Sequence, residues 1–295
     1  MSIEFSFSLK KNSSRKSNNA NLEPSVISGK DNNGPIVILI HGLTGTPHEM
    51  SFLAGFLKRA GYLVICPRLA NHGQPIEILK DTTWQDFYRS VRDIFVETMK
   101  QDRPVFVSGL SMGALLALLL AEEFPDKVSG VSCLSPTIFY DGWNVPWYTC
   151  FLPIAYHTPL KHFMYFKEEP PYGIKNETVR SHVHDHYSKA KLHEATDVNI
   201  YGYPYFPLIL LYQLNLLVKH LSKKLGGITV PVQLIQAKED DMTSVKNSQF
   251  IYDKISSKTK EIVLLNNSYH VITADQERDK VAREMADFFA KCKWK

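Results

Sequence analysis

The chain has 295 residues, which is enough for one large domain with a substantial core, or for such a domain carrying an insertion. Hydrophobic residues make up 44% of the chain and charged residues 22%, values typical of a soluble globular protein. The formal net charge of +4 is small and evenly spread, which argues against a nucleic-acid partner but is compatible with contact to an anionic membrane surface.

The four cysteines favour a reducing compartment, because none of them forms a C-x-x-C pair and they are too few for a disulfide framework. The first residues lack the charged and apolar segments of a signal peptide, and no apolar stretch is long enough to span a bilayer. We therefore expect a cytoplasmic protein that is soluble or peripheral to a membrane.

Residues 1–34 are expected to form a flexible arm and lead-in, because the stretch 10–21 is rich in Ser, Asn and Lys. Residues 35–136 then alternate between short apolar runs and stretches with helical periodicity. The runs are 36–40, 62–66, 104–107 and 128–134, the helices between them are 47–60, 82–99 and 114–124, and 67–81 is expected to be a long surface loop. This alternation predicts an α/β fold whose sheet is mostly parallel and has helices on both faces.

A serine stands between the third apolar run and its helix, in the pattern Gly109-Leu110-Ser111-Met112-Gly113. A strand that turns this sharply into a helix brings the two so close that side chains two positions before and after the serine would collide. The turn exposes the hydroxyl group and leaves the Met112 amide unpaired at the positive end of the helix. We interpret the pattern as a nucleophile elbow.

The loop 41–47, with sequence HGLTGTP, follows the first strand. Its two glycines allow backbone amides to approach a ligand, so the Leu43 N–H is expected to bind an oxyanion beside the Met112 N–H. His41 is expected to be a structural hydrogen-bonding residue, because it belongs to the loop that holds the substrate oxygen.

Residues 137–227 interrupt the alternation and are rich in aromatic residues and proline. We interpret them as an inserted cap, or lid, that lines an apolar pocket; an ordinary helical subdomain with its own core is the alternative. His182, His184 and His186 would suit metal ligation if they lay on a strand, but no fourth ligand follows at a recognisable spacing. We therefore expect solvated histidines, no metal and no cofactor.

Residues 228–295 resume the alternation, with strands at 230–235 and 262–265 and helices at 244–255 and 276–291. A serine hydrolase needs a base and an acid, which follow the serine in the order acid, then histidine. His270 comes directly after the last strand and is the predicted base. Asp240 is the predicted acid; Glu239 and Asp241 are its rivals, Asp241 being the stronger.

Four blocks, HGLTG, GLSMG, QAKEDDM and SYHVITADQE, resemble those of the α/β-hydrolase carboxylesterases, most closely the small bacterial carboxylesterase and monoacylglycerol lipase group. The resemblance covers about 35–134 and 230–291 but not the cap, and Tyr269 stands where the group commonly has glycine. It implies an α/β-hydrolase fold with Ser111, Asp240 and His270 as the catalytic triad and the Leu43 and Met112 amides as oxyanion donors.

The expected activity is hydrolysis of carboxylic esters through an acyl-enzyme, on a small or lipid-like ester with an apolar acyl chain. An acyl thioesterase or an acyltransferase would use the same triad. A non-catalytic ligand receptor with this fold is the alternative of a different class. The cap could touch a membrane surface transiently, and the sequence does not predict the oligomeric state.

Overall fold

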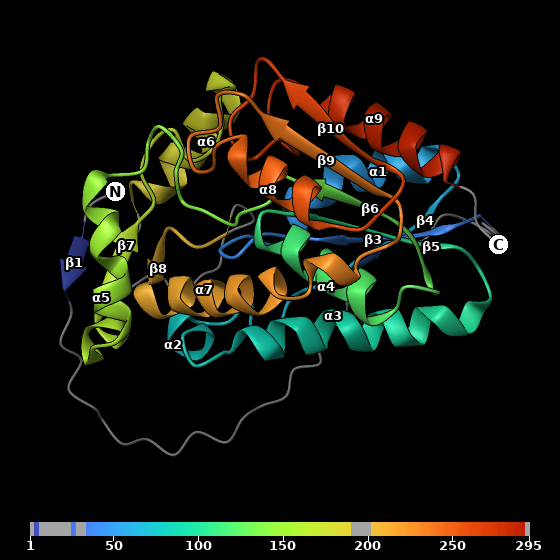
Figure 1. Ribbon diagram of the computed structural model, residues 1–295. Coiled ribbons are helices and arrows are strands. Elements are labelled where there is room, and N and C mark those ends of the chain that lie inside the picture. Colours follow the sequence, from blue (N-terminus) through green and yellow to red (C-terminus); the bar gives the residue numbers. More distant parts are fainter. Residues whose placement is uncertain (1–2, 6–24, 28–33, 190–201, 293–295) are drawn as a thin grey trace.

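The computed structural model describes residues 3–5, 25–27, 34–189 and 202–292. Within these residues, seven strands form one sheet in the order β10-β9-β6-β5-β3-β4-β2 (Figure 1). All neighbouring pairs are parallel except β2 with β4. The strands are β2 (Ser25–Ile27), β3 (Ile36–Ile40), β4 (Leu63–Cys66), β5 (Val105–Leu110), β6 (Val128–Leu134), β9 (Val232–Ala237) and β10 (Lys260–Leu265).

Helices cover both faces of this sheet, and every residue of the inner strand β3 is apolar and buried. Ile36, Ile38 and Ile40 pack on the side of α3 (Trp84–Thr98), α4 (Met112–Glu123) and α7 (Leu208–Ser222). Val37 and Leu39 pack on the side of α1 (Ser51–Arg59) and α9 (Arg278–Lys291). The predicted fold class is confirmed.

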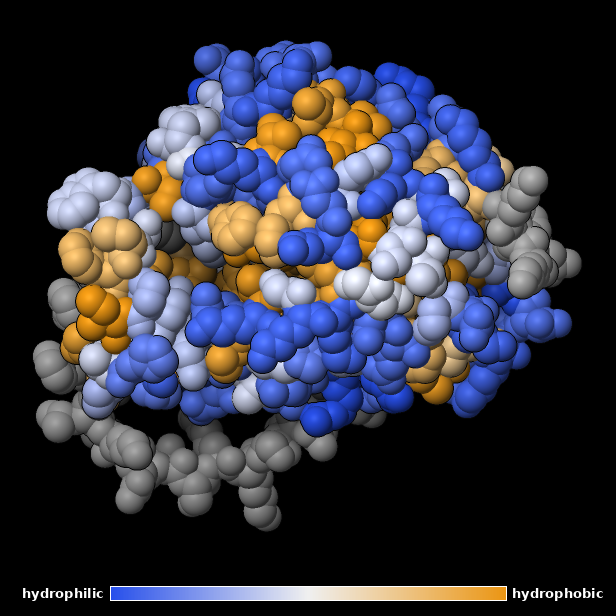
Figure 2. Space-filling view, viewed as in Figure 1, coloured by the Kyte–Doolittle hydropathy of each residue, from blue (hydrophilic) through white to orange (hydrophobic). Residues whose placement is uncertain are grey.

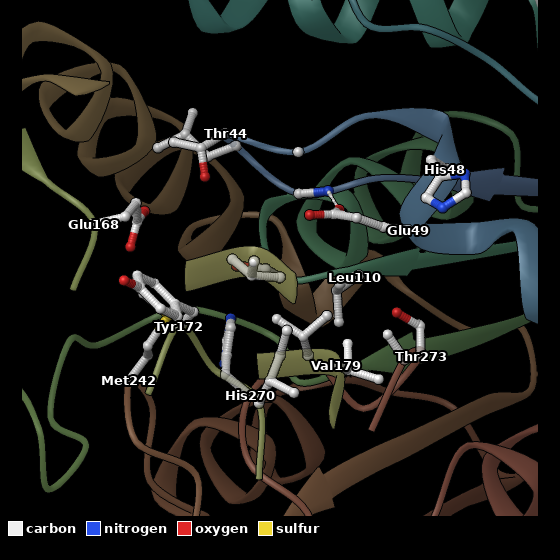
Figure 3. A pocket seen from close by; sticks show the side chains of 18 of the residues that line it. Thr44, His48, Glu49, Leu110, Glu168, Tyr172, Val179, Met242, His270 and Thr273 are labelled. Carbon is white, nitrogen blue, oxygen red and sulfur yellow. Dashed lines mark hydrogen bonds between the residues drawn. The ribbon is translucent and has the colours of Figure 1, made fainter. Parts of the chain in front are cut away.

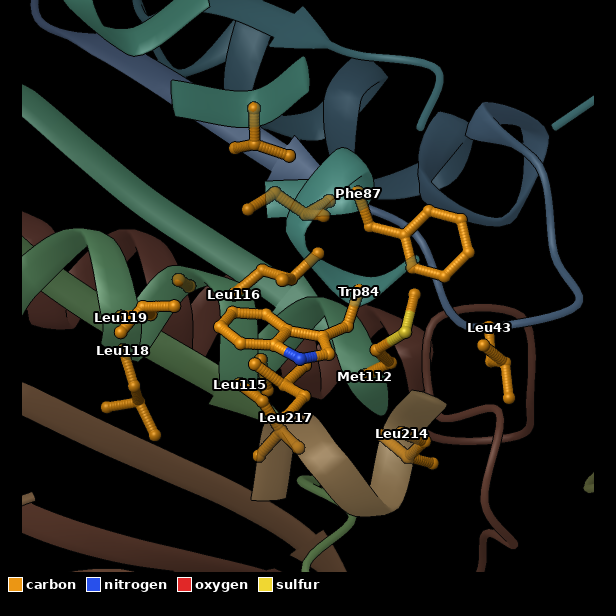
Figure 4. Packing of buried hydrophobic residues seen from close by; sticks show 14 of the residues in the cluster. Leu43, Trp84, Phe87, Met112, Leu115, Leu116, Leu118, Leu119, Leu214 and Leu217 are labelled. Carbon is orange, nitrogen blue, oxygen red and sulfur yellow. The ribbon is translucent and has the colours of Figure 1, made fainter. Parts of the chain in front are cut away.

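The helix α4 is apolar on every side, because it lies between the sheet and two other helices. Figure 4 shows that Leu115 of α4 packs against Trp84 of α3 and Leu217 of α7. Burial of each such leucine contributes about 1.5–3 kcal/mol to folding. This packing holds the first turn of α4, and therefore Ser111, in place.

Outside residues 137–227, the remaining helices are short or lie at the ends of the larger elements. They are α8 (Lys246–Lys254), the four-residue α2 (Ile76–Leu79) and the 3-10 turns η1 (Pro47–Met50) and η2 (Met99–Gln101). None of the helices in the described part of the chain is both long and apolar enough to cross a membrane.

Two expectations about connecting segments need correction. The arm contributes two short strands, β1 (Ile3–Phe5) and β2, that we did not predict, because pairing with β7 and β4 stabilises pieces too short to show a pattern. The stretch 10–21 lies outside the described residues. The segment 67–81 is not a simple surface loop: Leu69, His72 and Leu79 are buried.

Within the described part of residues 137–227, the structure contains η3 (Trp147–Phe151), α5 (Leu152–Tyr156), η4 (Pro159–His162), β7 (Met164–Lys167), α6 (Glu177–Tyr187), β8 (Tyr205–Pro207), α7 and η5 (Leu225–Gly227). Strands β1, β7 and β8 form a separate antiparallel sheet, whereas α7 packs against α3 and α4. His182, His184 and His186 lie on the helix α6 and are exposed. They do not lie on a strand, which was the condition for metal ligation. No group of potential metal ligands occurs among the described residues.

Candidate active site

Ser111 occupies a strained turn between β5 and α4, with φ 57° and ψ −116°. A non-glycine residue in this region costs on the order of 1–3 kcal/mol, so the surrounding packing must hold it. A Cβ atom at Gly109 would lie 2.2 Å from the Gly113 carbonyl group, and one at Gly113 would lie 2.3 Å from the Ile40 oxygen. Both glycines are therefore required by the close approach of β5, α4 and β3.

The His270 imidazole lies against the Asp240 carboxylate, with Nδ1 at 3.0 Å from Oδ2 and 3.1 Å from Oδ1. Asp240 is buried and also accepts hydrogen bonds from the backbone N–H groups of Met242 (2.9 Å) and Thr243 (2.8 Å) and from Gln236 Nε2 (2.7 Å). Because an ionised carboxylate only accepts, the proton on the ring belongs on Nδ1 and Nε2 is left as a base.

The pKa of His270 reflects two opposing effects. Burial lowers this pKa, but the charge and hydrogen bond of Asp240, with smaller contributions from Asp241 and Glu49, raise it above 6.5 overall. These acidic groups together, Asp240 foremost, therefore favour the protonated imidazole by more than burial disfavours it.

The two rivals of Asp240 make other contacts. Asp241 accepts hydrogen bonds from the backbone N–H groups of His270 (3.2 Å) and Gly173 (3.1 Å). Glu239 is exposed and forms an ion pair with Lys175 at 2.6 Å. Of the three acids, Asp240 is the one hydrogen-bonded to the His270 ring.

The Ser111 hydroxyl group opens on the same cavity as His270 and hydrogen-bonds the Thr137 hydroxyl group at 2.9 Å. If His270 is the base, as predicted, the serine would have to exchange this partner for the imidazole. Such rearrangement is common, because catalytic hydrogen bonds often form only once substrate is bound.

Of the residues with the two predicted oxyanion donors, Leu43 lines the cavity and Met112 directly follows Ser111 in the chain. Met112 is the first residue of α4, where the helix provides no acceptor for its N–H. In the loop after β3, His41 Nδ1 donates to the Gly42 carbonyl (2.9 Å), and its Nε2 accepts from Leu69 N–H (3.2 Å). His41 is thus a structural hydrogen-bonding residue, as expected.

His72 is a residue that the sequence analysis did not identify. Its Nε2 lies 2.7 Å from the Leu43 carbonyl oxygen, and burial lowers its pKa to about 4, so it donates as a neutral ring. The Leu43 N–H belongs to the preceding peptide group, whose Gly42 carbonyl is held by His41. The only signal in the sequence was a histidine beside a glycine in a loop.

The cavity beside Ser111 has a volume of about 260 Å³ and is mostly apolar (Figure 3). Residues from the core and from 137–227 both line it, including Phe52, Leu110, Tyr140, Tyr172, Ile174, Val179, Val183, Tyr187, Phe206 and Val271. Glu49 and Glu168, which the sequence analysis did not single out, also face it, and burial raises the pKa of each to about 7.

Asp275 connects the segment 137–227 to the loop that carries His270. Its carboxylate accepts hydrogen bonds from the backbone N–H groups of Lys175 (3.0 Å), Asn176 (2.8 Å) and Tyr269 (2.7 Å). Asn176 caps α6, whose Val179 and Val183 line the cavity. The wall of the cavity is therefore attached directly beside the histidine.

A mostly parallel sheet covered by helices, with a serine on a tight strand-to-helix turn, is the architecture of the α/β-hydrolases. The chain belongs to the hydrolase family described as serine aminopeptidase, S33, whose profile matches residues 31–277.

Individual relatives cover nearly the whole chain. The thermostable monoacylglycerol lipase of Bacillus sp. (strain H-257) is 32% identical over 260 residues, which are 88% of this chain and 92% of that protein. The carboxylesterase of Bacillus subtilis (strain 168) is 26% identical over 265 residues, 88% and 93% of the two chains. A solved structure described under LipS and LipT, two metagenome-derived lipolytic enzymes, has a TM-score of 0.73 at 26% identity and covers 91% of this chain and 97% of its own.

Proposed function

We propose that this protein is a serine hydrolase that cleaves carboxylic esters through an acyl-enzyme. The observation that carries the proposal is the pairing of the His270 ring with the buried Asp240 carboxylate beside Ser111, at the rim of one apolar cavity. The similarity to a monoacylglycerol lipase and a carboxylesterase supports the same reaction class.

In the proposed mechanism, His270 Nε2 takes the proton from the Ser111 hydroxyl group as its oxygen attacks the ester carbonyl carbon. The carbonyl oxygen becomes an oxyanion, held by the N–H groups of Leu43 and Met112. His270 then gives the proton to the alcohol oxygen as the carbon–oxygen bond breaks, leaving an acyl-enzyme. A water molecule, deprotonated by His270, attacks this ester, and the acid leaves as Ser111 regains the proton.

The proposed substrates are monoesters of medium to long acyl chains, such as monoacylglycerols or lysophospholipids. The apolar lining of the cavity supports an acyl chain, because burial of each methylene group contributes about 0.8 kcal/mol. Glu168 supplies a hydrogen-bonding group in the same cavity, which would suit an alcohol with free hydroxyl groups.

A panel of acyl esters tests this substrate class. We expect kcat/KM for p-nitrophenyl esters to rise by about tenfold or more from acetyl to octanoyl, because each added methylene contacts the apolar lining. Monooleoylglycerol should be hydrolysed faster than trioleoylglycerol, and an oleoyl thioester serves as the comparison for thioesterase activity. A sharp preference for the acetyl ester, or for the thioester, would contradict the proposal.

We also propose transient membrane contact through 137–227. Trp143, Trp147, Phe151 and Ile154 in this segment are 59%, 78%, 54% and 66% exposed, and Figure 2 shows hydrophobic residues gathered in the region of α5. Exposed aromatic side chains of this kind favour the interface between lipid and water. The contact would place the cavity near a lipid-borne ester.

The vesicle test uses a double variant, Trp147→Ala with Phe151→Ala. We expect it to reduce co-sedimentation with phosphatidylcholine vesicles by about fivefold or more, since two large apolar side chains are lost. Ile78→Ala, which removes an exposed apolar side chain on α2, is the matched control and should change nothing. Equal sedimentation of the double variant and the parent would refute membrane contact at this site.

A further inference from the structure

Glu49 lies in η1, directly after the loop that carries the proposed oxyanion donor Leu43. Its side chain turns back onto this loop, where Oε2 accepts a hydrogen bond from Gly42 N–H at 3.1 Å (Figure 3). The carboxyl group also faces the cavity that contains Ser111 and His270. An acidic side chain therefore touches the oxyanion loop from the substrate side.

The loop has room for this carboxyl group because residue 45 is glycine. A Cβ atom at Gly45 would lie 2.1–2.2 Å from all three atoms of the Glu49 carboxyl group. One at Gly42 would lie 3.6 Å from Glu49 Oε2, an ordinary van der Waals contact, so Gly42 is not needed for this space. Gly45 has no unusual backbone angle, so the space above it, rather than its conformation, is what glycine provides.

The contact completes the hydrogen bonding of the peptide groups around Leu43. His41 holds the Gly42 carbonyl, His72 holds the Leu43 carbonyl, and Glu49 holds Gly42 N–H. Gly42 and Leu43 together have two N–H and two carbonyl groups. Within the described part of the chain, the Leu43 N–H is the one of these four groups that has no hydrogen-bond partner. Because the neighbouring groups are already hydrogen-bonded, this N–H is the one that is left to bind an oxyanion.

We propose that Glu49 is a positioning residue for ester hydrolysis: it orients the oxyanion loop through Gly42 N–H, and its charge acts on His270. The inference rests on the proposed function. It assigns to Glu49 two separable contributions, one from its oxygen as a hydrogen-bond acceptor and one from its ionisation.

The ionisable groups around Glu49 come from several elements. His270 follows β10, Glu168 and Tyr187 come from 137–227, Arg278 opens α9, and His48 precedes Glu49 in η1. Burial raises the pKa of Glu49 to about 7, while the hydrogen bond from Gly42 and the charge of His270 oppose the rise. In return, ionised Glu49 raises the pKa of His270, so the ionisation of each group depends on that of the other.

Two substitutions separate the contributions. Glu49→Gln keeps an oxygen acceptor for Gly42 N–H but removes the charge; Glu49→Met keeps the length of the side chain and removes both. We expect Glu49→Gln to keep plateau kcat within about threefold, and Glu49→Met to lose about 10- to 100-fold in kcat with KM within about twofold. Both variants should shift the acid limb of kcat/KM to lower pH, because His270 loses a charge that raises its pKa.

A double-mutant cycle with Gly45 tests the contact itself. Gly45→Ala should lower kcat about tenfold by displacing the carboxyl group, but less than about twofold in a Glu49→Ala background, where no carboxyl group remains. Gly55→Ala is the control, since its added Cβ would meet only Arg59 Nη1 at 3.5 Å. Thermal unfolding and fluorophosphonate titration of Ser111 establish that each variant is folded and how much of it is active.

The outcomes distinguish this inference from the proposed function. If the parent enzyme hydrolyses no ester and fluorophosphonate does not label Ser111, the proposed function fails. If the parent is active and Glu49→Met keeps the kcat of Glu49→Gln, or neither variant moves the acid limb, or Gly45→Ala costs the same in both backgrounds, the role of Glu49 is wrong.

Discussion

Ser111→Ala is expected to lower kcat for ester hydrolysis by about 10⁴- to 10⁶-fold, because the attacking oxygen is lost and the other groups have no nucleophile to activate. The residual rate would come from the oxyanion donors and substrate binding alone. The fold should be unchanged, since the alanine keeps the Cβ atom that the turn accommodates. Steady-state kinetics with p-nitrophenyl octanoate and circular dichroism measure the two effects.

Ser108→Ala provides a matched control for this change. Ser108 lies three positions earlier, in β5, where its buried hydroxyl group donates to the Ser132 carbonyl at 2.7 Å. Its loss should cost about 1 kcal/mol of stability and leave kcat nearly unchanged. A Ser111→Ala enzyme that hydrolyses esters at the parent rate, or a fluorophosphonate adduct on another residue, would disprove the role of Ser111.

Asp240→Asn is expected to lower plateau kcat/KM on the order of 10³- to 10⁴-fold, because the amide no longer holds His270 in the tautomer with a free Nε2. The direction of the pH effect follows from the pKa of His270. Asp240 raises that pKa and burial lowers it, so removing the carboxylate lowers it. Since the neutral ring is the base, the acid limb of kcat/KM should move to lower pH even as the plateau falls.

Asp241→Asn separates the two neighbouring acids. Asp241 also raises the pKa of His270, but it contacts the His270 backbone N–H and not the ring. We expect a loss of about tenfold or less and a smaller shift of the acid limb. If Asp241→Asn costs as much as Asp240→Asn, the assignment of the orienting acid is incorrect. Circular dichroism of both variants excludes unfolding as the cause.

Much of the fold could be predicted because apolar runs and glycines are local signals. The run at Ile36–Ile40, apolar at every position, indicated a strand buried on both faces, and the structure places it inside the sheet, between β5 and β4. The arm was less predictable: β1 and β2 exist through pairing with β7 and β4, and nothing within three residues encodes a distant partner.

The candidate site shows the same division. Ser111, Asp240 and His270 could be predicted as site residues because each lies just past the end of a predicted strand. Such positions meet at one edge of a parallel sheet. His72 and Glu49 could not be selected, because their importance comes from contacts with Leu43 and Gly42 across the loop. Polar residues in loops are usually solvated, so neither stood out in the pattern.

By itself, the amino-acid sequence determined the α/β alternation and the glycine pair around Ser111, because backbone sterics and hydrophobic periodicity act between near neighbours. Only the tertiary structure decided which of three adjacent acids meets the His270 ring, and which side chains hold the peptide groups around Leu43. Those choices depend on distances of a few ångströms between segments far apart in the chain, and these exist only once the sheet and its helices have packed.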